Sequence, residues 1–79
     1  MAKSKLETVH LRQYADEDEP PYARITTFLR DVERAARPDI SGACCVAWAG
    51  VHVVLMQLID ERKVTVDTSV HPWEYVWNN

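Results

Sequence analysis

The sequence predicts a small α+β domain in which a strand, two helices and a second strand follow one another, ahead of an aromatic C-terminal segment. Three patterns support this class: partial alternation of apolar residues over 6–14, a three-and-four apolar repeat over 21–37, and clean alternation over 64–70. With 79 residues, the chain is expected to form a single domain over residues 1–79. A domain of this size buries only about 60–65% of its unfolded surface.

The N-terminal part is expected to contain a half-buried strand followed by an acidic loop. Residues 1–5 are expected to fray, and the strand follows at residues 6–14. The loop at residues 15–20 carries consecutive acidic residues and ends in a proline, which cannot continue a strand ladder. Negative charge at this point complements the positive end of the helix predicted to follow.

The next element is predicted to be a helix over residues 21–37. Its apolar positions recur at the three-and-four spacing of one helical face. They are Ile25, Phe28, Leu29, Val32, Ala35 and Ala36. Pro38 is expected to end this helix, because the residue before a proline is steered away from helical angles.

Residues 43–59 are the most apolar stretch of the chain, interrupted only by Gly50, His52 and Gln57. We interpret them as a central helix that extends to about Arg62, since the stretch is long and rich in good helix formers. A helix that is apolar on every side is normally enclosed, and so short a chain has few segments with which to enclose it. The alternative is a buried β-hairpin turning at Ala49–Gly50, which the valines on both sides of that turn would favour.

The C-terminal segment, residues 71–79, is expected to be a short helical turn or an extended arm. His71 and Pro72 should stop the strand at 64–70, because proline cannot donate a ladder hydrogen bond. Helical spacing would group Trp73, Val76 and Trp77. Extended spacing would instead align Trp73, Tyr75 and Trp77.

Composition argues against several classes of protein. Hydrophobic residues make up 47% and charged residues 27%, which is typical of a globular chain rather than a disordered one. The net charge of −3 provides no general attraction to phosphate or to anionic lipid. The first ten residues lack the apolar core of a secretory signal, and residues 43–59 fall short of the roughly 20 that span a bilayer. We therefore expect a cytoplasmic protein without membrane contact.

No pattern of catalytic or metal-binding residues is present in the sequence. Cys44 and Cys45 are adjacent, whereas zinc sites use cysteines two to four residues apart and disulfides staple separate parts of a fold. The histidines share no ligand spacing either; they are His10, His52 and His71. His52 is expected to be a satisfied core or interface residue. With only two glycines, a phosphate-binding loop is hard to build, so we expect no enzyme activity, metal or cofactor.

The surplus of apolar and aromatic residues predicts a protein that works by binding another protein. Such a protein would be a regulator, adaptor or inhibitor, and it would self-associate, as a homodimer or a larger assembly, through residues 43–59. Tryptophan and tyrosine are enriched at binding hot spots, and clustered carboxylates on a loop can mimic nucleic-acid phosphates. The candidate partner-binding residues are Trp48, Trp73, Tyr75, Trp77, Asp16, Glu17, Asp18 and Glu19.

A nucleic-acid-binding module is the alternative interpretation. Arg30, Arg34 and Arg37 are spaced by four and three residues, so on one helix they would form a stripe able to follow a phosphate backbone. The apolar helix followed by the strand at 64–70 also resembles the last helix and wing of a winged-helix domain. However, this helix lacks the polar face that reading the major groove requires.

Overall fold

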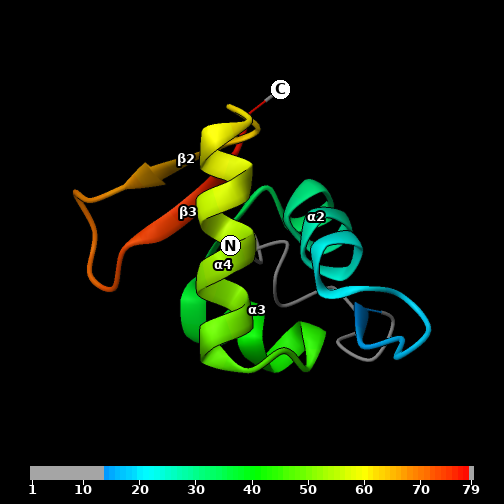
Figure 1. Ribbon diagram of the computed structural model, residues 1–79. Helices are drawn as coiled ribbons and strands as arrows, with labels where there is room; N and C mark the ends of the chain where they lie inside the picture. Colours follow the sequence, from blue (N-terminus) through cyan, green and yellow to red (C-terminus); the bar gives the residue numbers. More distant parts are fainter. Residues whose placement is uncertain (1–13, 79) are drawn as a thin grey trace.

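The computed structural model describes residues 14–78 and confirms the α+β class (Figure 1). Within these residues, three helices pack against one three-stranded antiparallel sheet. The elements are α2 (Pro21–Val32), β1 (Arg34–Ala36), α3 (Arg37–Cys44), α4 (Trp48–Asp60), β2 (Val64–Asp67) and β3 (Glu74–Trp77). The frayed tip and most of the strand predicted over residues 6–14 lie outside the described residues.

The C-terminal segment forms the central strand of the sheet, so its extended interpretation is confirmed. The strand order is β1-β3-β2, with both pairs antiparallel. Tyr75 lies opposite Ala35 on one side and opposite Val66 on the other. Beyond the β1 pairs, the backbone N–H of Trp77 donates a 2.8 Å hydrogen bond to the carbonyl of Glu33. The last strand therefore joins parts of the chain that are far apart in the sequence.

The first helix is shorter than predicted, because α2 ends at Val32 rather than at residue 37. Glu33 closes it with a positive φ of 75°, and its N–H donates to the carbonyl of Leu29 at 2.8 Å. Residues 34–36 then extend to pair with β3. Pro38 was expected to end a helix but lies in the first turn of α3, where its missing N–H costs no hydrogen bond.

The predicted central helix is confirmed as α4, but it begins at Trp48 rather than at residue 43. The hairpin alternative is wrong because Ala49 and Gly50 lie inside α4. The first two residues of the apolar stretch belong instead to α3, which ends at Cys44 and whose axis is bent by 111° from that of α4. Cys45 makes the break in a left-handed conformation, with φ 52° and ψ 47°. Arg24 of α2 satisfies the end of α3 by donating to the carbonyl of Cys44 at 3.0 Å.

The core is formed by the inward faces of the helices and the sheet. α2 and α4 contribute four buried apolar side chains each, at the spacing of one helical face. These are Ile25, Phe28, Leu29 and Val32 from α2, and Val51, Val54, Leu55 and Leu58 from α4. Tyr14 closes the core next to Phe28 with ring centroids 5.1 Å apart, and its hydroxyl donates to Asp31 at 2.9 Å. Burial, followed by this hydrogen bond, raises the pKa of Tyr14 to about 12.

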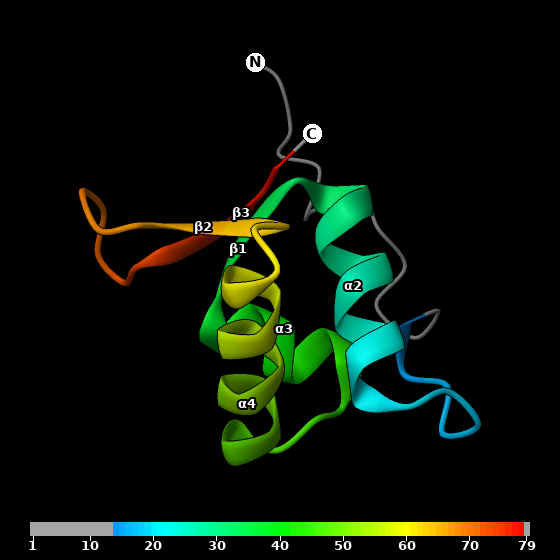
Figure 2. The same ribbon diagram turned by 45° about the horizontal axis from the view of Figure 1, so that its top comes forward.

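The order of the elements and of the strands resembles that of a winged-helix domain. In this comparison, α3 and α4 correspond to the last two helices of such a domain. Residues 68–73, between β2 and β3, correspond to its wing, and we call them the wing loop. Figures 1 and 2 show this loop projecting from the sheet on the side away from α2. Folds of one topology carry many activities, so the topology by itself assigns none.

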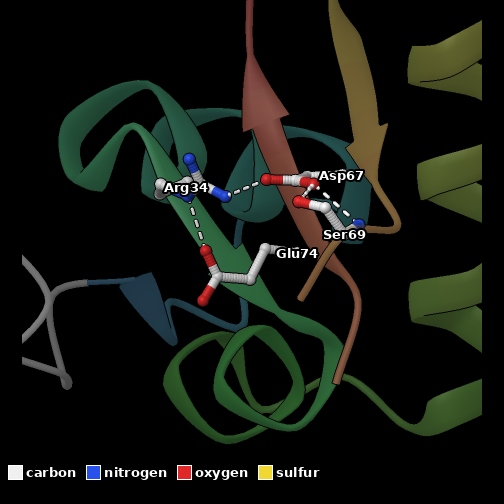
Figure 3. Close-up of polar contacts among 4 residues, drawn as sticks. All are labelled: Arg34, Asp67, Ser69 and Glu74. Carbon is white, nitrogen blue, oxygen red and sulfur yellow. Dashed lines mark hydrogen bonds and ion pairs between the residues drawn. The ribbon is translucent and has the colours of Figure 1, made fainter. Parts of the chain in front are cut away.

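Three charged side chains link all three strands; we call them the Arg34 clasp (Figure 3). Arg34 of β1 donates from Nε to Glu74 of β3 and from a terminal nitrogen to Asp67 of β2, both at 2.5 Å. Ser69 donates to Asp67 from its hydroxyl at 2.5 Å and from its backbone N–H at 2.9 Å. The hydrogen bond from the Ser69 hydroxyl, then that from Arg34, lowers the pKa of Asp67 from 3.8 to about 2.

Opposite sides of α4 should respond differently to truncation. Leu58 is fully buried, so Leu58→Ala should lower the free energy of unfolding by about 2–4 kcal/mol. Met56 faces outward on the same helix, and Met56→Ala should change it by less than about 0.5 kcal/mol. Urea denaturation followed by circular dichroism measures both. Equal losses would contradict the orientation of α4 described above.

The Arg34 clasp should make stability sensitive to acid. Because folding lowers the pKa of Asp67, the clasp stabilises the folded state fully above pH 3.8, and this contribution is lost as the pH falls towards about 2. Asp67→Asn should lower the free energy of unfolding at neutral pH. It should also make that free energy fall less steeply between pH 3.8 and about 2. Urea unfolding at a series of pH values measures it, with Asp60→Asn, an exposed change outside the clasp, as the matched control. An unchanged acid profile would exclude a contribution from Asp67.

Candidate functional site

The outward side of α4 and the adjoining wing loop expose large apolar side chains. Trp48 is 55% exposed, Val53 63% and Met56 46% on the helix, and Trp73 is 47% exposed at the end of the wing loop. On α4 they share one side, opposite the buried positions, together with the exposed His52. We call Trp48, His52, Val53 and Met56 the α4 face. Exposed tryptophan, valine and methionine on one helix form a surface that water solvates poorly.

A hollow of about 410 Å³ adjoins the α4 face. Its walls come from the start of α3, the start of α4, the wing loop and β3. They consist of Arg37, Pro38, Trp48, His71, Pro72, Trp73 and Tyr75. We call it the aromatic hollow. The bend between α3 and α4 matters here, because it allows the first residues of both helices to line the same site.

Arg37 provides the positive charge of the aromatic hollow. Its guanidinium carbon lies 5.7 Å from the centre of the Trp48 ring, a cation–π contact. The side chain is half-buried, and within residues 14–78 it forms no ion pair. A partly desolvated arginine of this kind keeps its planar set of donors available to an incoming carboxylate.

The predicted aromatic site residues have different environments. Trp48 and Trp73 are exposed and meet at the aromatic hollow. Tyr75 is buried but forms part of the same wall, whereas Trp77 is half-buried against the core. Sequence reasoning missed the contributions of Arg37, His71 and Pro72 to this site. The sequence did contain one signal for them, since Trp73, a predicted binding residue, directly follows His71 and Pro72.

The acidic loop lies apart from the aromatic hollow. Its residues, Asp16, Glu17, Asp18 and Glu19, are all exposed. A turn organises them, in which the N–H of Glu19 donates to the carbonyl of Asp16 at 3.0 Å and the N–H of Asp18 donates to the Asp16 carboxylate at 2.9 Å. Figures 1 and 2 show this loop and the wing loop on opposite sides of the molecule, so the two predicted surfaces do not form one site.

The arginine stripe predicted for the first helix is not formed, because α2 ends before two of its members. Arg30 is exposed on α2, Arg34 belongs to β1 and Arg37 begins α3. Arg34 is already paired with two carboxylates in the Arg34 clasp, which raises its pKa. The three charges therefore occupy three elements and different environments.

The two adjacent cysteines lie in different environments. Cys44 is buried, which raises the pKa of its thiol to about 12 and holds it in the unreactive, protonated form. Its Sγ lies 3.6 Å from the carbonyl of Arg24, to which it donates. Cys45 is exposed at the break between the helices. Within residues 14–78, no three potential ligands gather to hold a metal ion.

In the described part of the chain, no single helix combines the length and apolarity needed to cross a membrane. Only α3 and α4 taken together pass that test by composition, across the 111° bend between them. Comparison of the chain with protein-family models, curated proteins and solved structures gives no match.

Proposed function

We propose that this protein is a non-catalytic protein-binding module, acting as a regulator, adaptor or inhibitor through the α4 face and the aromatic hollow. The observation that carries the proposal is the exposure of Trp48, Val53 and Met56 on α4 and of Trp73 beside it. Tryptophan, tyrosine and arginine, the residue types most common at binding hot spots, all line the adjoining hollow. The two unpaired cysteines agree with a cytoplasmic location, where thiols stay reduced.

The size of the apolar surface argues for self-association when no other partner is present. Covering the exposed parts of those four side chains contributes roughly 3–6 kcal/mol, about half the value for full burial. Lost freedom on association costs an estimated 4–15 kcal/mol or more, so the partner must also contribute buried apolar surface to the complex. In a symmetric dimer the second copy brings the same face and doubles the gain. We therefore expect a weak homodimer rather than a tight one.

Charges placed on the α4 face should abolish this association. The double variant Val53→Asp, Met56→Asp should remain monomeric, because pairing would bury four unpaired carboxylates across the dimer. Both positions are exposed, so its circular dichroism spectrum should match the wild type. Light scattering at several concentrations measures the mass, with Thr27→Asp on the exposed side of α2 as the matched control. A wild type that stays monomeric at every concentration would contradict self-association.

Nucleic-acid binding is the second candidate function, and the winged-helix topology is the observation that favours it. The charges argue against it. Within α4, the helix that would enter the major groove, there is no lysine or arginine. Of the proposed arginines, Arg34 is already neutralised by the Arg34 clasp.

A salt titration separates the two functions. Duplex binding through several phosphates weakens steeply with salt, with a slope of about −0.9 per phosphate neutralised. We expect no such binding of duplex DNA by the wild type. Binding that is steep in salt and lost on replacing Arg30, Arg34 and Arg37 with glutamine would favour the nucleic-acid function instead. Fluorescence anisotropy of a labelled duplex provides the measurement.

A further inference from the structure

We infer that the aromatic hollow binds an extended peptide segment that places a carboxylate on Arg37 and an adjacent apolar side chain against Trp48 and Trp73. This inference rests on the proposed protein-binding function and specifies the chemistry of the partner. It turns a general apolar surface into a site that distinguishes an acidic from a neutral segment.

The first argument is the electrostatic state of Arg37. Arg37 is a half-buried residue whose guanidinium lies over the Trp48 ring and has no carboxylate partner within residues 14–78. Asp39 lies in the same first turn of α3 yet makes no ion pair with it. Glu74, which directly follows Trp73, is bonded to Arg34 instead. The hollow thus contains a cation that forms no ion pair with either of these two acids.

The second argument is the composition of the walls. Apart from Arg37 and His71, the lining side chains are tryptophan, tyrosine and proline. A volume of about 410 Å³ lies within the usual ~300–1,000 Å³ range of sites that enclose a bound group. Aromatic walls of this kind accept apolar and proline-containing segments, as the grooves of several peptide-binding domains do. A carboxylate beside an apolar side chain complements both parts of the site.

The third argument separates a peptide from a nucleic acid. Trp48 and Trp73 offer rings on which a base could stack, but nucleic-acid binding also draws its affinity from several phosphate contacts. Arg37 is the only lysine or arginine among the hollow's lining residues, and the adjoining α4 face adds none. One arginine fork can bind a single carboxylate with two parallel hydrogen bonds, without further cations. A peptide can also continue from the hollow onto the apolar α4 face.

Binding of two matched peptide pools tests the inference. One pool has aspartate or glutamate fixed at the centre of short N-acetylated peptides, with leucine, phenylalanine, proline and serine varied around it. The other has asparagine or glutamine at the centre. Because arginine forms stronger hydrogen bonds with a carboxylate than with a neutral amide, the acidic pool should bind roughly tenfold or more tightly. The indole N–H signals of Trp48 and Trp73 report binding in nuclear magnetic resonance spectra, and Trp77 serves as the internal reference.

Two variants should fail in different ways. Arg37→Gln should reduce binding of the acidic pool to the level of the neutral pool, whereas Arg30→Gln, the same change on α2, should leave both pools unaffected. Trp73→Ala removes an exposed apolar wall and should weaken both pools alike. Circular dichroism shows whether each variant folds. Weaker binding of the acidic pool alone indicates recognition of the carboxylate, whereas weaker binding of both pools indicates general loss of the site.

Several results would overturn the inference. Equal binding of the two pools, full binding of the acidic pool by Arg37→Gln, or no binding of either pool would each do so. Tighter binding of an oligothymidine than of the acidic pool, lost steeply with salt, would assign the hollow to nucleic acid. The peptide experiments test only the inference about the hollow. Self-association through Val53 and Met56 is tested separately by light scattering. Failure of the inference can therefore be distinguished from failure of the proposed function.

Discussion

β3 pairs with β1 on one side and with β2 on the other. The last strand therefore connects residues 34–36 with residues 64–67 in one sheet. This pairing determines more than the sheet. It requires residues 34–36 to be extended, which ends α2 at Val32 and directs the chain into α3. It also fixes Trp73 at the entry to the sheet, beside the first residues of α3 and α4. The aromatic hollow depends on this pairing, because β3 and the residue before it provide Tyr75 and Trp73 of its wall.

The same pairing explains which parts of the structure could be predicted from the sequence. The α+β class, the start of α2 and the strand at 64–67 follow from local patterns that the tertiary structure keeps. β1 could not be found in this way, because Ala35 and Ala36 are buried in the sheet yet also fit the apolar repeat of a longer helix. The break at Cys45 carries no glycine or proline signal. It depends on Arg24, which reaches from another helix to the carbonyls that end α3. The hollow depends on the pairing of β1 with β3 and on the contact of Arg24 with the end of α3. Both join residues that are distant in the sequence, so only some of the residues that line the hollow could be predicted.

The apolar character of residues 43–59 has two origins that the sequence alone does not separate. Val51, Val54, Leu55 and Leu58 are apolar because they form the core, while Val53, Met56 and Trp48 are apolar and exposed. Leaving the second group of apolar side chains in contact with water is unfavourable. On its outward side α4 carries these apolar side chains, and it contains no lysine or arginine that could contact phosphates. The chemistry of the helix therefore weighs more than the topology in choosing between protein and nucleic acid.

The charges of the sheet and of the aromatic hollow are connected through Glu74. It lies between Trp73 and Tyr75 in the sequence and opposite Ala36, the residue directly before Arg37. Arg34 binds the Glu74 carboxylate, whereas Arg37 lies over the Trp48 ring. Two arginines three residues apart thus have different environments, because one belongs to a strand and the other to the helix that follows it. The register of β1 against β3 places Glu74 opposite Ala36, so this register decides which of the two arginines the carboxylate neutralises.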